Sequence, residues 1–335
     1  MAKRAAISHR LRVFVTQPVA PSAIALLRKV ATVTVNPDSS RILPRRALIA
    51  AVRRCDILFC LLHDQIDAGV IAASPNLRLI AAQSITPSHI DMDEANGQRI
   101  PVTCVPARTT EATADLAFAL MLAAARWLLE GDRLVRAGRF PGAQSAHLMG
   151  ALVHGKMLGL IGGNGRIGSA VARRARGFDM RVLYWSPYRS TKKEERENGV
   201  IYVPLATLLR RSDFVSVHAP LNDETRHLVG APELRLMKKT AFLINTARGP
   251  IVDEAALVRA LAKNQIAGAG LDVFEHEPKL DPAMTRLANV VLTPHPGSAT
   301  PDVREEMANI VVDNILAFLA GRKLPNCVNP QVFAL

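Results

Sequence analysis

A glycine-rich turn after an apolar run is the feature that most limits how this chain can fold. Residues 157–161 have the composition of a buried strand, and a Gly-x-Gly-x-x-Gly sequence at Gly163, Gly165 and Gly168 runs into a helical pattern over 167–176. The first two glycines allow a tight turn and close approach of the backbone to a pyrophosphate, and the third lets helix and strand pack closely. In this strand–turn–helix context, the sequence predicts a dinucleotide-binding turn.

The rest of the chain alternates apolar runs with helical patterns, which indicates parallel sheets covered by helices on both faces. Before the helix predicted over 110–129, strands are predicted over 12–16, 32–36, 56–62, 77–82 and 101–105. After it, they are predicted over 157–161, 181–184, 214–217, 241–244, 267–271 and 290–292. The later series is a six-strand doubly wound set, and a last helix is predicted over 301–320.

The net charge of +13 raises the question of a polyanionic partner, but its distribution argues against one. Residues 1–55 hold eleven basic residues and one acid, so this segment carries +10 of the surplus. Aromatic residues, which stack on bases in nucleic-acid sites, make up only 4% of the chain. We interpret the segment as a solvated basic region and expect no nucleic-acid partner.

Two further observations concern membranes and metals. The longest clean apolar run, 116–125, is shorter than the roughly 20 residues of a membrane-spanning helix, so we expect no membrane partner. The four cysteines form no Cys-x-x-Cys pair and have no zinc-like spacing, so we expect no metal site. Free thiols and the absence of a secretory signal favour a cytoplasmic location.

Recognition of the cofactor's ribose is expected at the end of the second Rossmann strand. A carboxylate there would bind the ribose diol, but Ser186 occupies that position and Arg189 follows three residues later. Without the acid, a 2′-phosphate is not repelled, and Arg189 is able to pair with it. The sequence therefore favours NADP(H) over NAD(H), with the alternative that Arg189 is only a surface charge.

Three reactive side chains each come soon after a predicted strand, where ligands bind in sheets of this kind: Arg248, Glu277 and His295. Reduction of a 2-oxo acid needs a hydride at the carbonyl carbon and a proton at its oxygen. A histidine supplies such a proton near neutral pH, and a neighbouring carboxylate orients it. An arginine holds a substrate carboxylate and polarises the carbonyl.

Together these segments resemble the D-isomer-specific 2-hydroxyacid dehydrogenases, in particular their glyoxylate/hydroxypyruvate reductase branch. The segments that carry the resemblance are Thr110–Asp115, Gly163–Gly168, Asn245–Gly249, Gly270–Pro278 and Pro294–Thr300. It implies that Arg248 binds and polarises substrate, that Glu277 supports His295 as acid/base, and that the protein is a homodimer. It also implies cofactor contacts, with Asp272 at the carboxamide, from Arg166, Ile167, His218, Pro220, Thr246, Asp272 and Gly297.

The chain departs from the family pattern at three places. Gly162 already closes the strand, so the glycine turn is one residue longer than usual. Ile85 and Thr86 stand where the family commonly has Val-Gly, whose backbone N–H groups hold the substrate carboxylate, so we assign these two residues to substrate binding. Pro296, between His295 and Gly297, removes one N–H donor.

We therefore predict an α/β protein of two doubly wound parallel-sheet domains with the active site in the cleft between them. A flavodoxin-like substrate domain takes residues 1–109 and is completed by 299–335, and a Rossmann dinucleotide-binding domain takes 110–298. The expected reaction is NAD(P)H-dependent reduction of a small 2-oxo acid such as glyoxylate or hydroxypyruvate to the D-2-hydroxy acid. Alternatives are a 2-ketogluconate or phosphite dehydrogenase of the same family, or a non-catalytic dinucleotide-sensing corepressor.

Overall fold

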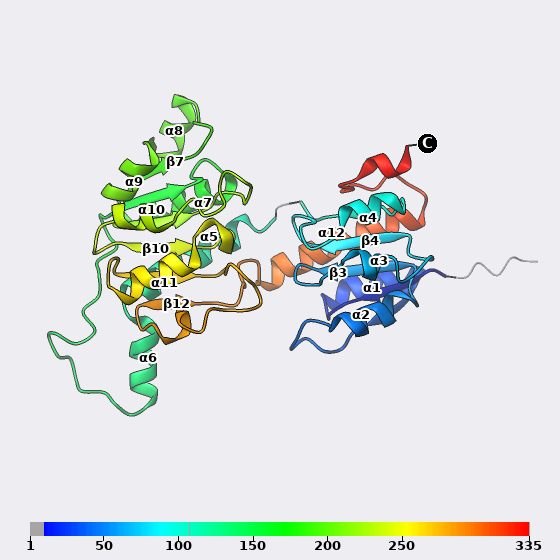
Figure 1. Ribbon diagram of the computed structural model, residues 1–335, viewed down its shortest axis with the longest axis horizontal. Coiled ribbons are helices and arrows are strands. Elements are labelled where there is room, and N and C mark those ends of the chain that lie inside the picture. Colours follow the sequence, from blue (N-terminus) through cyan, green and yellow to red (C-terminus); the bar gives the residue numbers. More distant parts are fainter. Residues whose placement is uncertain (1–9, 107, 335) are drawn as a thin grey trace, which may run out of the picture. The chain divides into compact units, whose positions relative to one another are not determined.

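The computed structural model describes residues 10–106 and 108–334, and the chain divides into two compact units (Figure 1). The first unit comprises Met1–Arg108 and Ala299–Leu335, and the second comprises Thr109–Ser298. Each unit contains one sheet in which all strand pairs are parallel. The prediction of two doubly wound parallel-sheet domains is confirmed.

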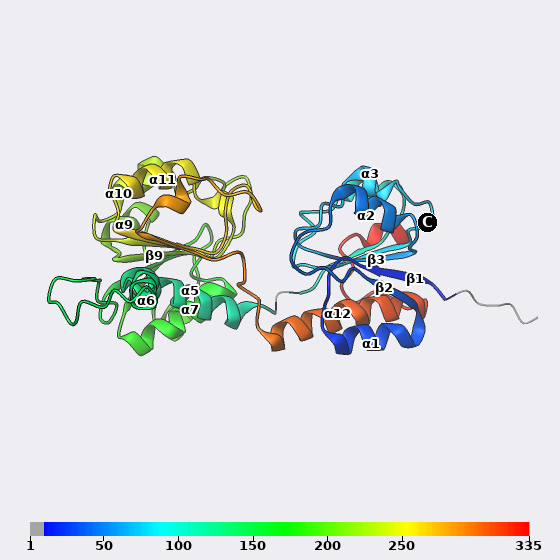
Figure 2. The ribbon, with the colours of Figure 1, turned by 90° about the horizontal axis from the view of Figure 1, so that it is seen from below.

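The first unit is built on a sheet of order β2-β1-β3-β4-β5, which is the flavodoxin-like order. Its strands are β1 (Arg12–Val15), β2 (Thr32–Val35), β3 (Ile57–Leu61), β4 (Leu79–Gln83) and β5 (Val102–Thr103). Its helices are α1 (Pro21–Val30), α2 (Arg45–Val52), α3 (Ala68–Ile71), α4 (Met92–Gly97) and α12 (Pro301–Leu319), with a final 3₁₀ turn η4 (Pro330–Phe333). Helices α1 and α12 cover one face, while α2 and α3 cover the other (Figure 2).

The second unit contains seven parallel strands in the order β12-β11-β10-β9-β6-β7-β8. They are β6 (Met157–Ile161), β7 (Arg181–Trp185), β8 (Val200–Tyr202), β9 (Phe214–Val217), β10 (Phe242–Asn245), β11 (Gly268–Leu271) and β12 (Val290–Leu292). The sequence predicted six of these and missed β8. This three-residue edge strand has an exposed middle residue, so it lacks the apolar run that marks the buried strands.

Helices pack on both faces of this second sheet (Figure 2). They are α5 (Thr110–Ala125), α6 (Leu128–Arg136), α7 (Arg166–Ala175), α8 (Lys192–Asn198), α9 (Leu205–Arg211), α10 (Ala231–Leu236) and α11 (Glu254–Ala262). Short 3₁₀ turns occur at η1 (Arg176–Phe178), η2 (Gly249–Ile251) and η3 (Met284–Arg286). Helices α5 and α7 lie on one face, and α9, α10 and α11 lie on the other.

The helix predicted over 110–129 is wrong at its end, because α5 stops at Ala125 and α6 leaves at 65°. Trp127 has a left-handed backbone with φ of 53°, and its indole Nε1 donates to the carbonyl of Met149 at 3.2 Å. The Ala151 N–H donates to the Ala125 carbonyl at 2.8 Å. Contacts from a segment 22 or more residues further along the chain therefore end the helix.

No single helix in the described ranges 10–106 and 108–334 is both long and apolar enough to cross a membrane. Only α5 and α6 taken together reach that length, and the pair is sharply bent.

The glycine turn is packed on the sheet beneath it. Gly162 has φ of +80°, a region that side-chain-bearing residues avoid, and a Cβ there would lie 2.7 Å from the backbone nitrogen of Ala219 beyond β9. A Cβ on Gly168 would lie 2.5 Å from the Gly162 carbonyl oxygen. The additional glycine before the motif is therefore the one that turns the chain, and Gly168 lets α7 begin directly above it.

We predict that Gly162→Ala lowers the free energy of unfolding by about 2 to 4 kcal/mol, since strain at positive φ adds to overpacking against backbone. Urea denaturation followed by circular dichroism measures this. Gly177→Ala is the matched control, because a Cβ there meets nothing within 4 Å and its φ is ordinary. Equal effects of the two substitutions would contradict this account of the turn.

Candidate active site

The carboxyl ends of the second unit's strands gather nearly all of the predicted cofactor and catalytic residues on one edge of a single sheet. At β6, the glycine turn leads into α7, whose N-cap residue Gly165 supplies no side-chain cap. The N–H groups of the first helical turn, which begins with the exposed Arg166 and the half-buried Ile167, are of the kind that bind phosphate.

Two buried polar atoms at the ends of β9 and β10 test whether this edge suits a dinucleotide. Within the described part of the chain, His218 Nδ1 and Thr246 Oγ1 are buried and make no hydrogen bond. His218 Nε2 lies 2.9 Å from Ser216 Oγ, and burial lowers the pKa of His218 to about 3, so the ring is neutral. Buried polar atoms in proteins normally have a hydrogen-bond partner. The two unpartnered atoms therefore fit a ligand that is rich in polar groups.

The predicted ribose position lies just beyond β7. Ser186 is buried there. Pro220, the other predicted cofactor residue in this part of the unit, follows β9 and is exposed. Arg189 pairs with Glu195, its Nε lying 2.7 Å from Oε1. The cation that the sequence offered for a 2′-phosphate therefore already has a carboxylate partner.

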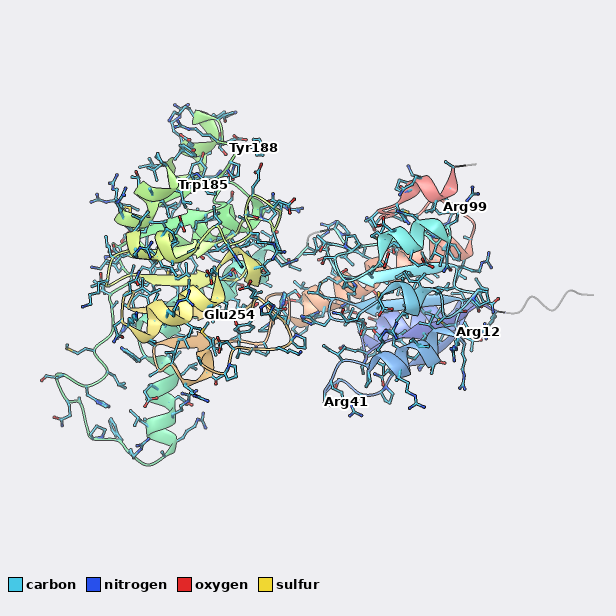
Figure 3. All side chains as sticks on the ribbon, in the orientation of Figure 1. Arg12, Arg41, Arg99, Trp185, Tyr188 and Glu254 are labelled. Atoms are coloured by element: carbon cyan, nitrogen blue, oxygen red, sulfur yellow. The ribbon has the colours of Figure 1, made fainter. Side chains whose placement is uncertain are left out.

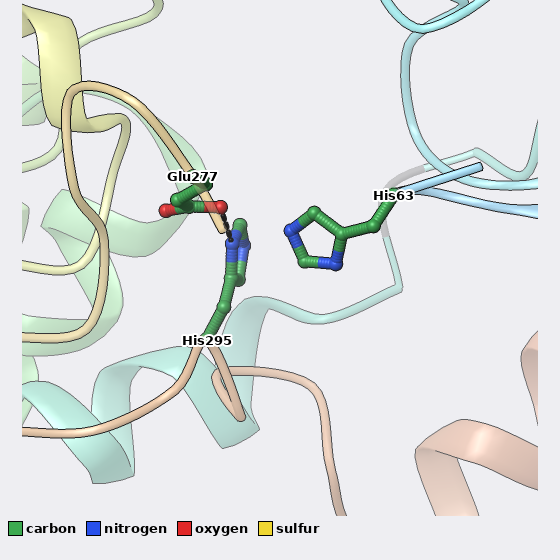
Figure 4. Close-up of side chains that lie close together, drawn as sticks. All are labelled: His63, Glu277 and His295. Carbon is green, nitrogen blue, oxygen red and sulfur yellow. Dashed lines mark hydrogen bonds and ion pairs between the residues drawn. The ribbon is translucent and has the colours of Figure 1, made fainter. Parts of the chain in front are cut away.

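His295 and Glu277 form the central pair of the site (Figure 4). His295 Nδ1 lies 2.8 Å from Glu277 Oε2, and both side chains are only 19% exposed. The Phe274 N–H donates to the other oxygen of Glu277 at 2.9 Å, which fixes the carboxylate. His295 has φ of +59°, a backbone conformation that is uncommon outside glycine. Such strain is frequent at functional positions.

The Asp272 carboxylate holds both flanks of His295. One oxygen accepts a hydrogen bond from Thr293 Oγ1 at 2.6 Å, and the other accepts from the Gly297 N–H at 3.0 Å. Burial raises the pKa of Asp272, although Thr293, His295 and Gly297 act in the opposite direction. Sequence reasoning missed Thr293; a hydroxyl residue directly after β12 was the available signal.

Arg248 follows β10 on a turn that is packed against the Glu277 loop. Asn245 shapes this turn by donating to the Arg248 carbonyl at 3.1 Å, and a Cβ on Gly249 would fall 1.9 Å from the carbonyl carbon of Phe274. The Arg248 side chain is half-buried, and burial lowers its pKa while the charge of Glu277 raises it. Because β10, β11 and β12 are neighbours, Arg248, Glu277 and His295 share one edge of the sheet.

The two residues assigned to substrate from the other predicted domain lie in the first unit, after β4. Ser84 Oγ donates to the Thr86 carbonyl at 2.9 Å, and the Thr86 hydroxyl lies 3.3 Å from that of Ser88. Thr86 is exposed and Ile85 is half-buried. Their role in substrate binding stays a prediction.

The chain is similar to known proteins over most of its length. A family model described as "D-isomer specific 2-hydroxyacid dehydrogenase, NAD binding domain" matches residues 118–297. A glyoxylate reductase of Korarchaeum cryptofilum is 50% identical over 86% of this chain and 87% of its own length. A glyoxylate reductase of Thermococcus litoralis is 44% identical over 96% of this chain and 97% of its own length. The crystal structure of the TT0316 protein from Thermus thermophilus has a TM-score of 0.87 and 40% identity, covering 95% of this chain and 100% of that one.

The half-buried His218, whose Nδ1 is fully covered, makes stability depend on pH. Its pKa of about 3 in the folded protein lies below the ordinary value of 6.5, so the unfolded chain binds the extra proton as the pH falls between these values. This contribution is fully present above about pH 6.5 and is lost towards about pH 3. We predict that the stability difference between wild type and His218→Gln shifts against wild type by up to about 2 kcal/mol from pH 7 to pH 5.

Urea unfolding midpoints at a series of pH values measure this difference. His147→Gln, at an exposed histidine, is the control for the exchange of histidine for glutamine. A pH-independent difference between wild type and His218→Gln would rule out burial of a neutral ring at His218.

Proposed function

Because the chain belongs to the D-isomer-specific 2-hydroxyacid dehydrogenase family, we propose that it is an NAD(P)H-dependent reductase of small 2-oxo acids, with glyoxylate or hydroxypyruvate as substrate. The product is the D-2-hydroxy acid. The observation that carries the proposal is the His295–Glu277 hydrogen bond, located on the same sheet edge as the glycine turn. The names of the glyoxylate reductase relatives support this choice of substrate.

The protein's own residues provide binding and proton transfer. Arg248 holds the substrate carboxylate and polarises the carbonyl, and its half-buried position strengthens both interactions because less water screens the charge. The reduced nicotinamide, when bound, supplies the hydride to the carbonyl carbon. His295 gives its Nε2 proton to the carbonyl oxygen, since Nδ1 is engaged by Glu277. The Glu277 carboxylate stabilises the protonated ring before the transfer.

The cofactor contacts follow from the same sheet edge. Gly163, Gly165 and Gly168 with the N-terminus of α7 would bind the pyrophosphate, and His218, Thr246 and Pro220 would contact other parts of the dinucleotide. Asp272 and Gly297 would contact the nicotinamide, and their mutual hydrogen bond also fixes the loop that carries His295. We propose NADP(H) as the preferred cofactor, because Ser186 replaces the acid that selects for an unmodified ribose.

The remaining parts of the proposal concern the whole protein. The first unit serves as the substrate domain, with the loop of Ile85 and Thr86 contributing to substrate binding, and the second unit serves as the cofactor domain. We further propose a homodimer that works in the cytoplasm. A corepressor would need no acid–base pair, so the paired Glu277 and His295 favour an enzyme over that alternative.

A panel of 2-oxo acids with NADPH and with NADH tests the function directly. We expect reduction of glyoxylate and hydroxypyruvate, followed by the loss of absorbance of the reduced cofactor. Cofactor binding without turnover of any 2-oxo acid would contradict the enzyme and favour the dinucleotide-sensing alternative. Reduction confined to 2-ketogluconate, or oxidation of phosphite in a separate assay with NAD(P)⁺, would favour the other dehydrogenases.

We predict that His295→Ala lowers kcat for glyoxylate by about 10²- to 10⁴-fold, since it removes the general acid. Cofactor affinity, measured by the fluorescence of bound NADPH, should stay near that of wild type. His154→Ala at the largely exposed His154 is the control. Substantial residual activity in His295→Ala would exclude this residue as the proton donor.

We predict that Ser186→Asp moves the ratio of kcat/KM for NADPH over NADH towards NADH by at least about tenfold, because a carboxylate repels a 2′-phosphate and accepts from a ribose diol. Steady-state kinetics with each cofactor at saturating glyoxylate give the ratio. An unchanged ratio would show that cofactor choice does not depend on this position.

A further inference from the structure

A buried carboxylate lies beneath the loop that follows β7. Glu195 on α8 has a side chain only 7% exposed, and three groups converge on its two oxygens. Arg189 binds it through Nε at 2.7 Å and Nη2 at 3.1 Å, and Lys192 Nζ lies 3.0 Å away. The Tyr184 hydroxyl donates at 3.0 Å. These bonds, with that of Arg189 the strongest, lower the pKa of Glu195 to about 2, so it is ionised at neutral pH.

The two cations on this carboxylate face outward. Arg189 is 43% exposed and Lys192 is 70% exposed, above a carboxylate that is almost completely covered. The Arg189 guanidinium also lies over the Tyr202 ring, 4.9 Å from its centroid. Its Nη1 is not part of the fork that grips Glu195. The group therefore presents two positive charges, one of them held in a fixed orientation, to any ligand that reaches the end of β7.

The glycine turn is tied to the same loop. Asn164, within the lengthened turn, donates from Nδ2 to the carbonyl of Tyr188 at 2.6 Å. The Ser190 N–H donates to the Tyr184 hydroxyl at 3.0 Å. Three consecutive residues, 188 to 190, are thus each held by a side-chain hydrogen bond, although the Tyr188 side chain itself is exposed (Figure 3). The turn that binds pyrophosphate and the loop beyond the ribose position form one connected structure.

We propose that Glu195 is a positioning residue that orients Arg189 and Lys192 as a receptor for the 2′-phosphate of NADP(H), with Asn164 fixing the distance between that receptor and the pyrophosphate turn. The inference rests on the proposed NADP(H) preference and names the residues that would create it. A pre-oriented cation loses less freedom on binding than a mobile one, so the buried acid increases phosphate affinity although its charge is negative.

The direction in which one substitution changes phosphate affinity distinguishes this proposal from an effect of net charge alone. Glu195→Gln removes a negative charge close to the phosphate, so Coulomb attraction alone predicts tighter binding. If Glu195 acts by orienting Arg189, the same change weakens binding. Tyr184→Phe provides a second variant without any change of charge, and it removes one bond to Glu195 and the acceptor for Ser190.

The test uses 2′,5′-ADP and 5′-AMP, which differ by the 2′-phosphate, and measures their Kd by titration calorimetry on the full chain. We expect wild type to bind 2′,5′-ADP more tightly. Arg189→Ala should weaken that binding about tenfold to a hundredfold, and Glu195→Gln about five- to tenfold, with 5′-AMP changed less than about twofold. Asn164→Ala and Tyr184→Phe should each cost about twofold to fivefold on 2′,5′-ADP alone.

Lys193→Ala is the matched control for Lys192→Ala. Both remove one exposed lysine from consecutive positions of α8, but Lys193 is 78% exposed and lies 3.9 Å from Glu197 instead of contacting Glu195. We expect Lys192→Ala to weaken 2′,5′-ADP about threefold to tenfold and Lys193→Ala less than about twofold. Equal losses of 2′,5′-ADP affinity in the two variants would contradict a specific role of Lys192 and indicate only a general attraction by the positive charges of α8.

Other outcomes overturn the inference in distinct ways. Tighter 2′,5′-ADP binding by Glu195→Gln contradicts a positioning role, and wild type that does not distinguish the two nucleotides contradicts the receptor itself. Because the nucleotides bind without turnover, failure to reduce any 2-oxo acid would contradict the proposed reaction while leaving these affinities informative. Thermal melting of each variant identifies any loss that comes from unfolding.

Discussion

The geometry of the site depends on the Asp272 carboxylate, which accepts hydrogen bonds from both Thr293 and Gly297 and so clamps the loop on either side of His295. Asp272 directly follows β11, and the loop it clamps follows β12, the neighbouring strand. A parallel sheet brings such ends together whatever the sequence between them. The clamp converts that general property into a fixed place for one imidazole, which Glu277 then orients from the same loop as Asp272.

The same sheet edge holds polar groups in surroundings that oppose their ionisation or leave them without partners. Burial lowers the pKa of His218 and Arg248 and raises that of Asp272, and Thr246 Oγ1 is buried without a hydrogen bond. Each of these costs stability in the isolated fold. Their concentration at one edge is what a binding site requires, because groups already removed from water interact more strongly with a ligand.

The sequence was sufficient for features that follow from short-range pattern: the parallel α/β class, the glycine turn and the strand-end positions of Arg248, Glu277 and His295. It was insufficient where distant segments decide. The end of α5 at Ala125 depends on contacts from Met149 and Ala151, and β8 is an edge strand too short to show a period. Glu195 lies in a run of lysines and glutamates that is typical of a solvated helix, so its burial could not be inferred.

Glu195 also changes how the positive charge of the chain bears on its ligand. Counting residues treats Arg189 as a free cation, whereas the structure pairs it with a carboxylate that Lys192 shares, which leaves one net positive charge among the three. The surplus of the N-terminal segment belongs to the first unit, whereas Arg189, Lys192 and Glu195 belong to the second. In the proposed receptor, selectivity for a phosphate would depend less on the number of charges than on the orientation of one guanidinium, which contacts a buried acid and a tyrosine ring. The lengthened glycine turn is joined to the loop that carries that guanidinium, because Asn164 donates from its side chain to the Tyr188 carbonyl.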